Sequence, residues 1–405
     1  MAGFGKGPWL RALCCGLVSC SAGSWSRTAS VTEAPRVPLF AVTGVATWRG
    51  DATAAYSLIH DDVCDDNLDT AFSIAAPELK KRGLHAGFGT IVGRCQQSGV
   101  DKWPAVRALV EDGHDVFSHS WSHPCLDADP ERPPEQCPRP PDVKYSADLV
   151  SEIERAGETL RAQTGVALDY FIFPYDYCAP RALTYLKEHG YLGARCGATE
   201  AMPINEPGFA DPFGAFFDVF GPAYSYYWDR GPCRGKVTQF TTPPYGVKSA
   251  PADCVEYVEN QYVADTIARK GWGIREFHGF HPGLNDAFEP ITRTDYTKHL
   301  DYLQAQSESG ALWVEGPSRV LRYRFARDAC PLPTLVGERT LHFAPASAAC
   351  LKYRTVLSYL ITADAARSAP SFVMQAGHHF ALKHVSAGHL VVDADPAAGD
   401  AELMP

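Results

Sequence analysis

Four short stretches of this sequence carry side chains that could do acid–base or metal chemistry. They are His60-Asp61-Asp62, His119-Ser120-Trp121-Ser122-His123, Pro174-Tyr175 and His278. Each follows an apolar or β-branched run of the kind that forms buried strands. An HxxxH pair or an adjacent Asp pair is weak alone, because both also occur among exposed or core residues. Their joint occurrence just after predicted strands is what indicates a site.

The histidine pair and the aspartate pair together could hold one metal ion. On a helical turn, a separation of four residues places His119 and His123 on the same face. A carboxylate from Asp61-Asp62 would complete a set of two imidazoles and one carboxylate, with positions open for water and substrate. Such a set suits zinc acting as a Lewis acid and activator of water. The sequence therefore predicts a divalent metal site, with Zn²⁺ as the favoured ion.

The elements that must position these residues alternate between strands and helices. Strands are predicted at 39–45, 55–59, 86–91, 115–118, 169–173, 191–194, 216–220, 273–277 and 311–314. Helices are predicted at 68–82, 101–112, 146–164, 180–189, 255–270, 293–307 and 316–327. This alternation indicates a parallel sheet, and its seven or eight units favour a (β/α) barrel over an open sheet. In a barrel, all four stretches would meet at the rim formed by the carboxyl ends of the strands.

The last part of the chain has a different pattern. Beyond 329–333, short alternating strands are predicted at 340–343, 357–362, 371–375, 380–384 and 389–393, with no helix of useful length. We therefore expect residues 38–328 to form the barrel domain and residues 329–405 a small antiparallel β-rich domain. The predicted fold class is α/β, a distorted (β/α) barrel followed by a small C-terminal β module.

The composition is that of an ordinary globular protein. The 405 residues are 45% hydrophobic and 21% charged, and 37 basic against 47 acidic residues give a net charge of −10. This acidic balance argues against a nucleic-acid partner, which needs a basic surface. No run of about 18 apolar residues occurs, so no ordinary transmembrane helix is expected.

The N-terminus predicts export. Residues 1–20 have a signal-peptide pattern, in which two early basic residues precede a short apolar stretch, and residues 21–37 would be a linker. The segment Leu17-Val18-Ser19-Cys20 resembles the lipobox of bacterial lipoproteins, which would place a lipid anchor on Cys20. The alternative is ordinary cleavage near Ala22-Gly23. Either way the mature chain would be exported, as a cell-surface or periplasmic lipoprotein or as a secreted protein.

The cysteines are consistent with that compartment. Ten remain once Cys14, Cys15 and Cys20 are set aside, and an even number in an exported chain predicts disulfides. Connectivity stays open, although near neighbours are the simplest partners: Cys125/Cys137, Cys178/Cys196, Cys233/Cys254 and Cys330/Cys350. No CxxC pair occurs, so a cysteine zinc site is not expected.

The order of the four stretches resembles the polysaccharide deacetylases of the NodB-homology class, carbohydrate esterase family 4. The family's Thr-Phe-Asp-Asp-Gly motif corresponds to Ile59-His60-Asp61-Asp62-Val63, and its His-Ser/Thr-x-x-His motif is matched in full at His119, Ser120 and His123. Its Arg-x-Pro-Tyr/Phe motif corresponds to Ile172-Phe173-Pro174-Tyr175, and its Leu-x-His motif to Glu276-Phe277-His278. The resemblance extends over most of the predicted barrel.

The resemblance implies a role for each matched residue. The metal ligands would be Asp62, His119 and His123, the general base Asp61 and the general acid His278. The backbone N–H of Tyr175, which follows Pro174, would help to stabilise a tetrahedral oxyanion. Trp313 would form a wall of the acetyl pocket, although core packing explains a Trp there equally well.

Two positions depart from the family's motifs. The glycine after the Asp pair is replaced by Val63, and the arginine that normally orients the base is replaced by Ile172. Another arginine near a strand end would have to take over, and we prefer Arg195 to Arg275. The motif that orients the acid histidine is not clearly present, although Asp218, Asp229 and Trp228 are stand-ins. Two further histidines, His60 and His281, flank the site and are more simply neighbours than ligands.

The resemblance implies a hydrolase acting on the carbon–nitrogen bond of linear amides other than peptides. It would remove N-acetyl groups from an extracellular polysaccharide of the chitin, peptidoglycan or poly-N-acetylglucosamine type. Two alternatives stay open: a weak or inactive glycan-binding lipoprotein on the same fold, suggested by the missing Arg and Gly, and an O-acetyl esterase, whose leaving group needs less help. The sequence leaves the glycan and the oligomeric state undetermined.

Overall fold

The computed structural model separates the chain into two units, residues 1–38 and 39–405. It describes residues 40–405 except 66–69, 98, 135–136, 138–142, 198–201, 220–225, 240–246, 281–290, 338, 364–369 and 387. The predicted signal segment with Cys20, the linker at 21–37 and His281 therefore lie outside the described residues. Within the described part of the chain, no helix is long and apolar enough to cross a membrane.

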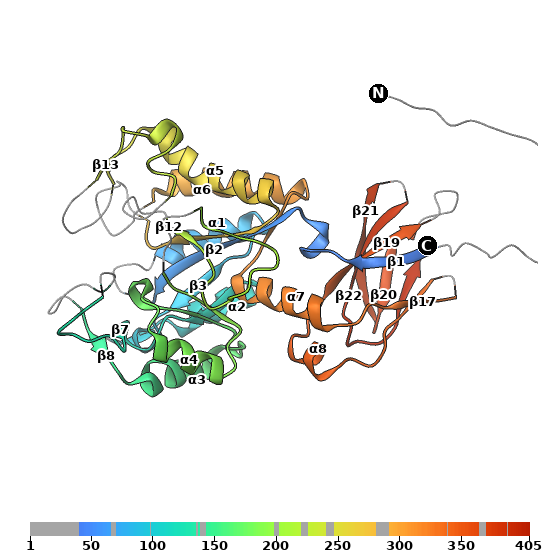
Figure 1. Ribbon diagram of the computed structural model, residues 1–405, viewed down its shortest axis with the longest axis horizontal. Coiled ribbons are helices and arrows are strands. Elements are labelled where there is room, and N and C mark those ends of the chain that lie inside the picture. Colours follow the sequence, from blue (N-terminus) through green and yellow to red (C-terminus); the bar gives the residue numbers. More distant parts are fainter. Residues whose placement is uncertain are drawn as a thin grey trace, which may run out of the picture. The chain divides into compact units, whose positions relative to one another are not determined.

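The predicted α/β fold class is confirmed by a curled, mostly parallel sheet (Figure 1). Its strands are β2 (Ala54–Val63), β3 (Gly87–Thr90), β6 (Asp115–Ser118), β9 (Tyr170–Ile172), β10 (Gly193–Arg195), β11 (Ile204–Asn205), β12 (Asp218–Val219), β15 (Trp272–Phe277) and β16 (Leu312–Val314). Their order is β10-β9-β6-β3-β2-β15-β11, with β12 also on β15 and β16 also on β2. Only β11 runs antiparallel to its neighbour within this set.

All seven predicted helices occur. They are α1 (Ala76–Lys81), α2 (Trp103–Glu111), α3 (Ala156–Thr164), α4 (Pro180–Glu188), α5 (Ala252–Arg269), α6 (Arg293–Glu308) and α7 (Pro317–Ala329). The helices α1 and α3 are preceded by π-helical turns at Ala71–Ala75 and Val150–Arg155. Several ends follow from local chemistry: proline opens α2, α4 and α7, and the side chain of Thr292 accepts a hydrogen bond from Asp295 N to cap α6.

Alternate residues of the strands serve two apolar clusters. An inner cluster is formed by Ala55, Ile59, Phe117, Tyr170, Ile172, Trp272 and Ile274, together with Val320 and Leu321 of α7. An outer cluster packs Tyr56, Leu58, Phe88, Val116 and Phe277 against α1, α2, α5 and α6. Because side chains alternate along a strand, each strand residue is assigned to one cluster by its position in the chain. We call the strand positions whose side chains face the inner cluster the inner series. Polar residues that continue this series past the carboxyl ends of the strands must therefore converge at one rim.

A second sheet of eight antiparallel strands contains the C-terminal part of the chain. Its order is β1 (Phe40–Val45), β19 (Leu357–Ala363), β22 (His389–Ala394), β21 (His378–Ser386), β20 (Phe372–Gln375), β23 (Ala401–Met404), β18 (Thr340–His342) and β17 (Thr334–Val336). The predicted antiparallel module is confirmed, with two additional strands and one short helix, α8 (Ala348–Lys352). The strand expected at 39–45 forms, but it pairs with β19 and not with the barrel strands. This N-terminal strand therefore belongs to the C-terminal sheet.

Short pairs of strands lie outside these two sheets. They are β4 (Gln96–Gln97) with β5 (Val100–Asp101), β7 (Cys125–Leu126) with β8 (Tyr145–Ser146), and β13 (Thr238–Gln239) with β14 (Val247–Ser249). Single 3-10 turns occur at Arg49–Asp51, Val92–Arg94, Pro174–Asp176 and Gly231–Cys233.

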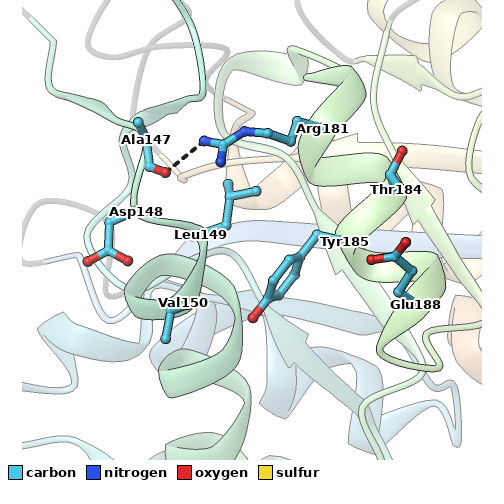
Figure 2. A pocket seen from close by; sticks show the side chains of 8 residues that line it. All are labelled: Ala147, Asp148, Leu149, Val150, Arg181, Thr184, Tyr185 and Glu188. Carbon is cyan, nitrogen blue, oxygen red and sulfur yellow. Dashed lines mark hydrogen bonds between the residues drawn. The ribbon is translucent and has the colours of Figure 1, made fainter.

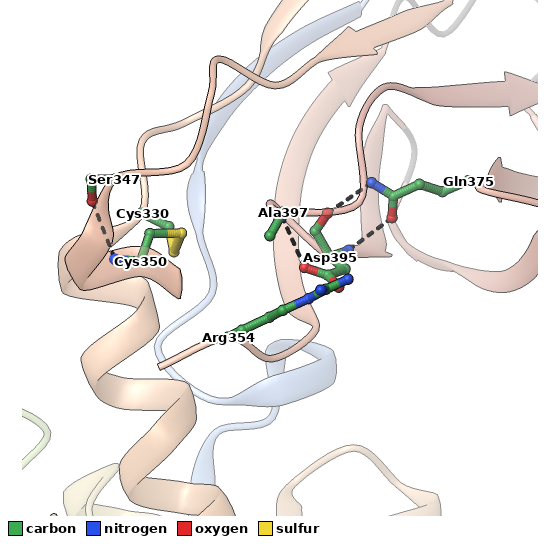
Figure 3. The surroundings of a disulfide bond; sticks show 7 residues. All are labelled: Cys330, Ser347, Cys350, Arg354, Gln375, Asp395 and Ala397. Atoms are coloured by element: carbon green, nitrogen blue, oxygen red, sulfur yellow. Dashed lines mark hydrogen bonds and ion pairs between the residues drawn. A yellow bond between two sulfur atoms is a disulfide. The ribbon is translucent and has the colours of Figure 1, made fainter. Parts of the chain in front are cut away.

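Five disulfides join the ten cysteines that follow the N-terminal segment. The four pairs expected from proximity all form, and the remaining two cysteines make the fifth bond, Cys64–Cys95. Figure 3 shows Cys330–Cys350, which ties the end of α7 to α8. Nearby, the buried amide of Gln375 donates to Asp395 O and accepts from Asp395 N, which holds the turn after β22. These contacts give the C-terminal sheet its own internal support.

Candidate metal centre and acid–base site

Three predicted metal ligands lie together at the carboxyl ends of β2 and β6. The Oδ1 atom of Asp62 lies 3.4 Å from His119 Nε2 and 3.2 Å from His123 Nε2. One donor atom from each residue falls within 4.8 Å of the other two. Two imidazoles and one carboxylate thus converge on a single point, as the sequence predicts.

The backbone of β2 explains how both neighbouring aspartates reach the site. Successive strand residues normally face opposite sides of a sheet. Here the pairing of β2 with β3 shifts register between His60 and Val63, and Asp62 has a left-handed φ of 58°. Asp61 continues the inner series after Ile59, while the irregularity turns Asp62 toward the histidines.

The two histidines are not on a helical turn, contrary to the geometry first expected. His119 directly follows β6, and His123 lies four residues further along an irregular loop. Ser120 and His123 have φ of 68° and 60°, and the hydroxyl of Ser120 accepts a hydrogen bond from His123 N at 2.9 Å. The loop folds back on itself, so the imidazoles meet with ring centres 4.7 Å apart. Left-handed residues other than glycine are costly, and they cluster at functional sites.

The donor set fits a divalent cation. The Nδ1 atom of His119 lies 3.0 Å from Ile172 O. Because a carbonyl oxygen only accepts, Nδ1 donates to it, and Nε2 is the ring nitrogen that faces Asp62. Burial lowers the pKa of His123 to about 4, so this imidazole is neutral near pH 7. Lone pairs and a carboxylate that face one another are stable when a cation lies between them.

The carboxylate of Asp62 is suited to that cation as well. Its Oδ1 atom is buried and has no hydrogen-bond partner among the described residues. Burial alone would raise the pKa of Asp62, but His123 and His119 lower it below its ordinary range. The group is therefore ionised over the physiological range of pH, as a metal ligand must be.

A second cluster lies beside the first and contains the predicted base and acid. Donor atoms of Asp61, Glu276 and His278 fall within 4.8 Å of one another. Asp61 Oδ2 lies 2.5 Å from Arg195 Nη2, and both side chains are almost fully buried. The Nδ1 atom of His278 lies 3.4 Å from Glu276 Oε1. The Asp61–Arg195 pair and the Glu276–His278 pair are therefore neighbours.

Of the two arginines that the sequence offered in place of the missing motif arginine, the preferred one, Arg195, is the one that contacts Asp61. It lies at the end of β10 in the inner series, next to β9, where Ile172 replaces the motif's arginine. The other candidate, Arg275, faces the outer cluster and pairs with Asp218 at 2.6 Å. Asp218 is therefore occupied with Arg275, and Glu276 is the carboxylate beside His278.

Pro174 and Tyr175 form a tight turn against the histidines. The turn Pro174–Asp176 follows β9, and Tyr175 has a φ of 57°. The ring of Tyr175 lies 4.8 Å from that of His123, and burial raises the pKa of its hydroxyl to about 12. Gly197 N donates to Asp176 O at 2.7 Å, and the disulfide Cys178–Cys196 spans the same two segments. The turn is thus held to the end of β10.

Two residues named by the sequence are placed elsewhere. Trp313 pairs with Ala55 at the start of β2, six residues and about 20 Å along the strand from Asp61. Its ring packs on Tyr323, so core packing explains it and the structure does not bring it to the site. His60 faces the outer cluster, where its Nε2 atom lies 2.8 Å from Tyr296 OH. Burial lowers the pKa of His60 to about 3, so it is a neutral core histidine.

Sequence reasoning did not assign three residues that complete the site. They are Glu276, which lies two residues before His278; Asp176, whose Oδ1 atom lies 3.0 Å from Arg195 Nη2; and Gly89. A Cβ atom on Gly89 would lie 3.0 Å from Asp61 Oδ1, so only glycine leaves room for the carboxylate. The period of two along β15 would have placed Glu276 beside His278, but the other two depend on the packing of neighbouring strands.

A separate surface pocket of about 260 Å³ lies between α4 and the turn that precedes α3 (Figure 2). Arg181, Tyr185 and Glu188 line it from α4, and residues 147–150 line it from the other side. Arg181 donates across it to Ala147 O at 2.8 Å. None of the predicted site residues lines this pocket.

The curled α/β sheet brings histidines and carboxylates together at one rim. Residues 57–194 match the family model of polysaccharide deacetylases, a family of deacetylating hydrolases. The matched range contains the Asp pair, both motif histidines and the Pro174–Tyr175 turn. Arg195, Glu276 and His278 lie beyond it.

Comparison with solved structures found distant likenesses only. A carbohydrate esterase family 4 pseudoenzyme from Bacillus anthracis has 13% identity and a TM-score of 0.38, covering 66% of this chain and 65% of its own. An acetyl xylan esterase of family 4 from Clostridium thermocellum, in complex with a cobalt ion, has 15% identity and a TM-score of 0.36, covering 66% and 89%. A peptidoglycan deacetylase mutant from Bacillus subtilis has 14% identity and a TM-score of 0.37, covering 70% and 96%.

The chain spans slightly less than two thirds of the Bacillus anthracis protein. No curated protein matched the sequence.

Proposed function

We propose that this chain is a metal-dependent hydrolase that removes N-acetyl groups from an extracellular polysaccharide. One observation carries the proposal: the donor set Asp62, His119 and His123 lies beside a buried carboxylate–arginine pair and a partnered histidine. Hydrolysis of an amide needs a water nucleophile, a base, an acid and a means of stabilising an oxyanion. Each of these roles has a candidate residue at the same rim.

The metal ligands in this proposal are Asp62, His119 and His123, and Zn²⁺ is the favoured ion because two imidazoles and one carboxylate leave a coordination position open. A bound ion would lower the pKa of a water molecule and polarise the acetyl carbonyl. Ile172 O fixes the ring of His119 by accepting from Nδ1, so the ligand needs no reorientation.

Asp61 is proposed as the base that takes the proton from the attacking water. Arg195 binds its Oδ2 atom, while Oδ1 is buried and without a hydrogen-bond partner among the described residues. The free oxygen is the one that can accept a proton. The absence of a side chain at Gly89 keeps a Cβ atom from lying 3.0 Å from that oxygen.

His278 is proposed as the acid that protonates the leaving amine. It lies within 4.8 Å of the Asp61 and Glu276 carboxylates, so base and acid flank one reacting carbon. An amine is a poor leaving group unless it is protonated, whereas an alcohol leaves more easily. A partnered histidine at this position therefore favours an amide substrate over an ester.

The turn at Pro174–Asp176 is proposed to complete the oxyanion site through the backbone N–H of Tyr175. Its left-handed φ and its attachment to β10 hold the peptide groups of the turn in one arrangement. Donors that are positioned before the reaction need no reorganisation during it.

Export is supported by the five disulfides, which persist in oxidising compartments. A polymeric substrate outside the cell is consistent with that location. The lipid anchor at Cys20 remains part of the proposal and would hold the enzyme near a cell-wall or matrix glycan.

The test is release of acetate by the chain lacking residues 1–20, together with analysis of bound metal. The substrates are acetylated chitin oligomers, peptidoglycan, poly-N-acetylglucosamine and acetylated xylan. We expect acetate from an N-acetylated glycan and about one zinc per chain, and a loss of about 10²–10⁴-fold in Asp61→Asn with zinc retained.

Two matched outcomes would contradict this proposal. Stoichiometric metal without acetate from any of these substrates would indicate a binding protein, and acetate from xylan alone would indicate an esterase. Asp218→Asn is the control, because it alters a buried aspartate that faces the outer cluster and should leave acetate release per folded chain unchanged.

A further inference from the structure

A buried carboxylate from the turn before α3 binds the loop that carries both proposed histidine ligands. Glu152 lies in this π-helical turn and is 5% exposed. Its Oε2 atom accepts from Trp121 N at 3.1 Å and from Ser122 N at 2.9 Å, and its Oε1 atom accepts from Ser122 Oγ at 2.8 Å. Both partners belong to residues 119–123, the ligand loop, which begins at His119 and ends at His123. One side chain therefore holds the middle of the ligand loop.

The ligand loop needs acceptors from elsewhere because it is neither helix nor strand. Amide groups outside regular structure have to find other partners. The first amide of the loop, His119 N, donates to Thr90 O at 2.8 Å, and the last, His123 N, donates to Ser120 Oγ at 2.9 Å. The two amides before His123 donate to the Glu152 side chain, and one of them is shared with Glu152 O at 3.1 Å. Replacing this carboxylate would therefore remove acceptors from the middle of the loop.

A second set of contacts holds the carbonyl groups of the ligand loop. Val92 N donates to Ser120 O at 3.1 Å, and Gly93 N donates to Trp121 O at 2.8 Å. A Cβ atom on Gly93 would lie 2.5 Å from Trp121 O, so this approach requires glycine. The 3-10 turn at residues 92–94 thus fixes carbonyl groups of the loop, while Glu152 fixes its N–H groups. Loss of either set would allow the loop to move relative to the other metal ligands.

Packing fixes the backbone that carries Glu152. The next residue, Ile153, and Leu149 lie in a buried apolar cluster that includes residues of β9 and α4. Arg155, in the same turn, places its guanidinium 3.8 Å from the centre of the Trp121 ring, a distance at which a cation is attracted to an aromatic face. Single π-helical turns occur frequently at functional sites. This turn therefore contacts the ligand loop at two points from a fixed position.

The burial of Glu152 has a cost in free energy that the ligand loop offsets. A carboxylate away from water is costly unless donors surround it. Each of its three side-chain hydrogen bonds comes from the ligand loop. Hydrogen bonds to a charged acceptor are about twice as strong as those between neutral groups. The contact is therefore stronger than an ordinary loop contact, and it requires a side chain that accepts with two oxygens.

We propose that Glu152 is a positioning residue for the metal ligand His123. By accepting from the two amides in the middle of the ligand loop, it holds the loop in the arrangement in which the second imidazole faces Asp62 and His119. Glu152 is not one of the residues whose donor atoms converge on the ion, so it acts through the loop. This inference rests on the proposed function and deepens it.

The test measures the zinc affinity of the full chain in Glu152→Met, by competition with a chromophoric chelator. Methionine is of similar length, but it lacks the two oxygens that accept from the loop. We expect the affinity for zinc to fall about 10–100-fold, the usual effect of changing a residue that orients a metal ligand. Glu152→Gln, which keeps one accepting oxygen, should lose less.

The matched control is Glu154→Met, the same change two residues along the same turn. The Glu154 carboxylate accepts from Tyr185 OH at 2.7 Å and so contacts α4, not the ligand loop. Its zinc affinity should stay within about 2-fold of the wild type, because changes away from such contacts have small effects. A loss in Glu154→Met as large as that in Glu152→Met would contradict the proposal.

A merely structural role of Glu152 would lower stability without changing the zinc affinity of the folded chain. The affinities are therefore compared at a temperature at which circular dichroism shows every variant to be folded. Equal zinc affinity in Glu152→Met and the wild type would overturn the proposal. If Glu152→Met does not fold, Glu152→Asp replaces it, because aspartate keeps the charge but is one methylene too short to reach both partners. Unchanged affinity in Glu152→Asp would then overturn the proposal.

A measurement on the metal-free chain tests the contact itself, and acetate release separates this inference from the proposed function. Hydrogen exchange at the Ser122 amide should be faster in Glu152→Met than in the wild type, and unchanged exchange would overturn the proposal. A wild type that binds zinc without releasing acetate would contradict deacetylation, while the zinc affinities of the variants would still decide the role of Glu152. A wild type that binds no zinc would overturn both.

Discussion

Two buried arginines of the same curled sheet, Arg275 and Arg195, have opposite surroundings. Arg275 faces the outer cluster, pairs with Asp218 at 2.6 Å and donates to Val258 O at 2.8 Å, and both charged side chains are at most 1% exposed. Arg195 faces the inner side and contacts three carboxylates, one of which reaches solvent. The Arg275–Asp218 pair lies among buried groups on the outer side of the sheet. The contacts of Arg195 extend to the rim, where Asp176 is partly exposed.

This difference separates a structural charge pair from the pair that we propose takes part in catalysis. Adjacent residues on β15, Arg275 and Glu276, belong to the two different networks because the strand alternates its faces. The outer network ends in backbone carbonyls, whereas the inner network ends in His278, beside Asp61 with its free oxygen. Burial of charge alone therefore does not indicate function; a path from the buried charge to an accessible group does.

Loss of a metal ligand on the inner side of the sheet should have the largest effect on bound metal and on acetate release. Asp62→Ala removes the only carboxylate of the donor set, so we expect bound zinc below one tenth of stoichiometry, a loss on the scale of about 10-fold or more, and acetate release near background. Asp218→Ala should keep the metal but lower the free energy of unfolding by about 3–5 kcal/mol, because Arg275 is left buried without its partner. Metal analysis measures the bound zinc of both variants, and denaturant unfolding measures their stability. Retention of zinc in Asp62→Ala would contradict the assignment of Asp62 as a metal ligand.

Replacing each arginine by lysine should have the next largest effect, on activity for Arg195 and on stability for Arg275. Arg195→Lys keeps a charge but cannot hold Asp61 and Glu276 at once, and misplacement of catalytic groups by about 1 Å can cost about 10²-fold in kcat. Arg275→Lys should mainly lower stability, by about 2 kcal/mol, through lost hydrogen bonds to Val219 O and Val258 O. Acetate release and urea unfolding measure the two effects. Equal losses of activity in both variants would contradict the distinction between a structural Arg275 and an Arg195 that supports activity.

Two disulfides allow the same comparison, because one lies beside the proposed site and the other lies away from it. Cys178–Cys196 holds the Asp176 turn to the residue after Arg195, whereas Cys330–Cys350 supports α7 and α8. Replacing either pair by serine should cost about 2–4 kcal/mol of stability. Only the first replacement should also reduce acetate release, by several-fold at a temperature where both variants are folded. An unchanged rate without Cys178–Cys196 would show that packing alone holds the turn.

A buried carboxyl remote from the site should affect stability only. Asp115 lies at the start of β6, where its Oδ2 atom accepts from Ser318 N at 2.7 Å, and burial raises its pKa from 3.8 to about 7. Between these values the folded chain binds more protons than the unfolded chain, so this group makes stability fall as pH rises from about 4 to about 7.

Asp115→Asn should therefore flatten the stability curve over that range of pH, and chemical unfolding at several pH values checks this. The pH profile of acetate release should stay as in the wild type, because Asp115 lies at the opposite end of β6 from His119. A shifted activity profile would show that the two ends of the sheet are coupled.

Much of the fold follows from local pattern. The seven helices and the central strands were predicted, because their apolar periodicity is strong and several of their ends carry proline or polar caps. Helices α1 and α3 begin eight and ten residues later than predicted, because π-helical turns precede them. The pairing of the strand at Phe40–Val45 was wrong, since a single apolar run does not specify which sheet it joins. Helix α8 and strands β17 and β23 were missed because they are too short to show a period.

The sequence by itself determined which chemical groups the site would contain, since the residues that match the motifs sit immediately after the strands that carry them. It also indicated that Arg195 could replace the arginine missing at Ile172. Only the tertiary structure decided that Arg195, and not Arg275, faces the site, that Glu276 stands beside His278, and that Trp313 lies far away. The physical reason is that a site is made where neighbouring strands converge, and both the register of those strands and the bulge at Asp62 depend on contacts between residues far apart in the chain.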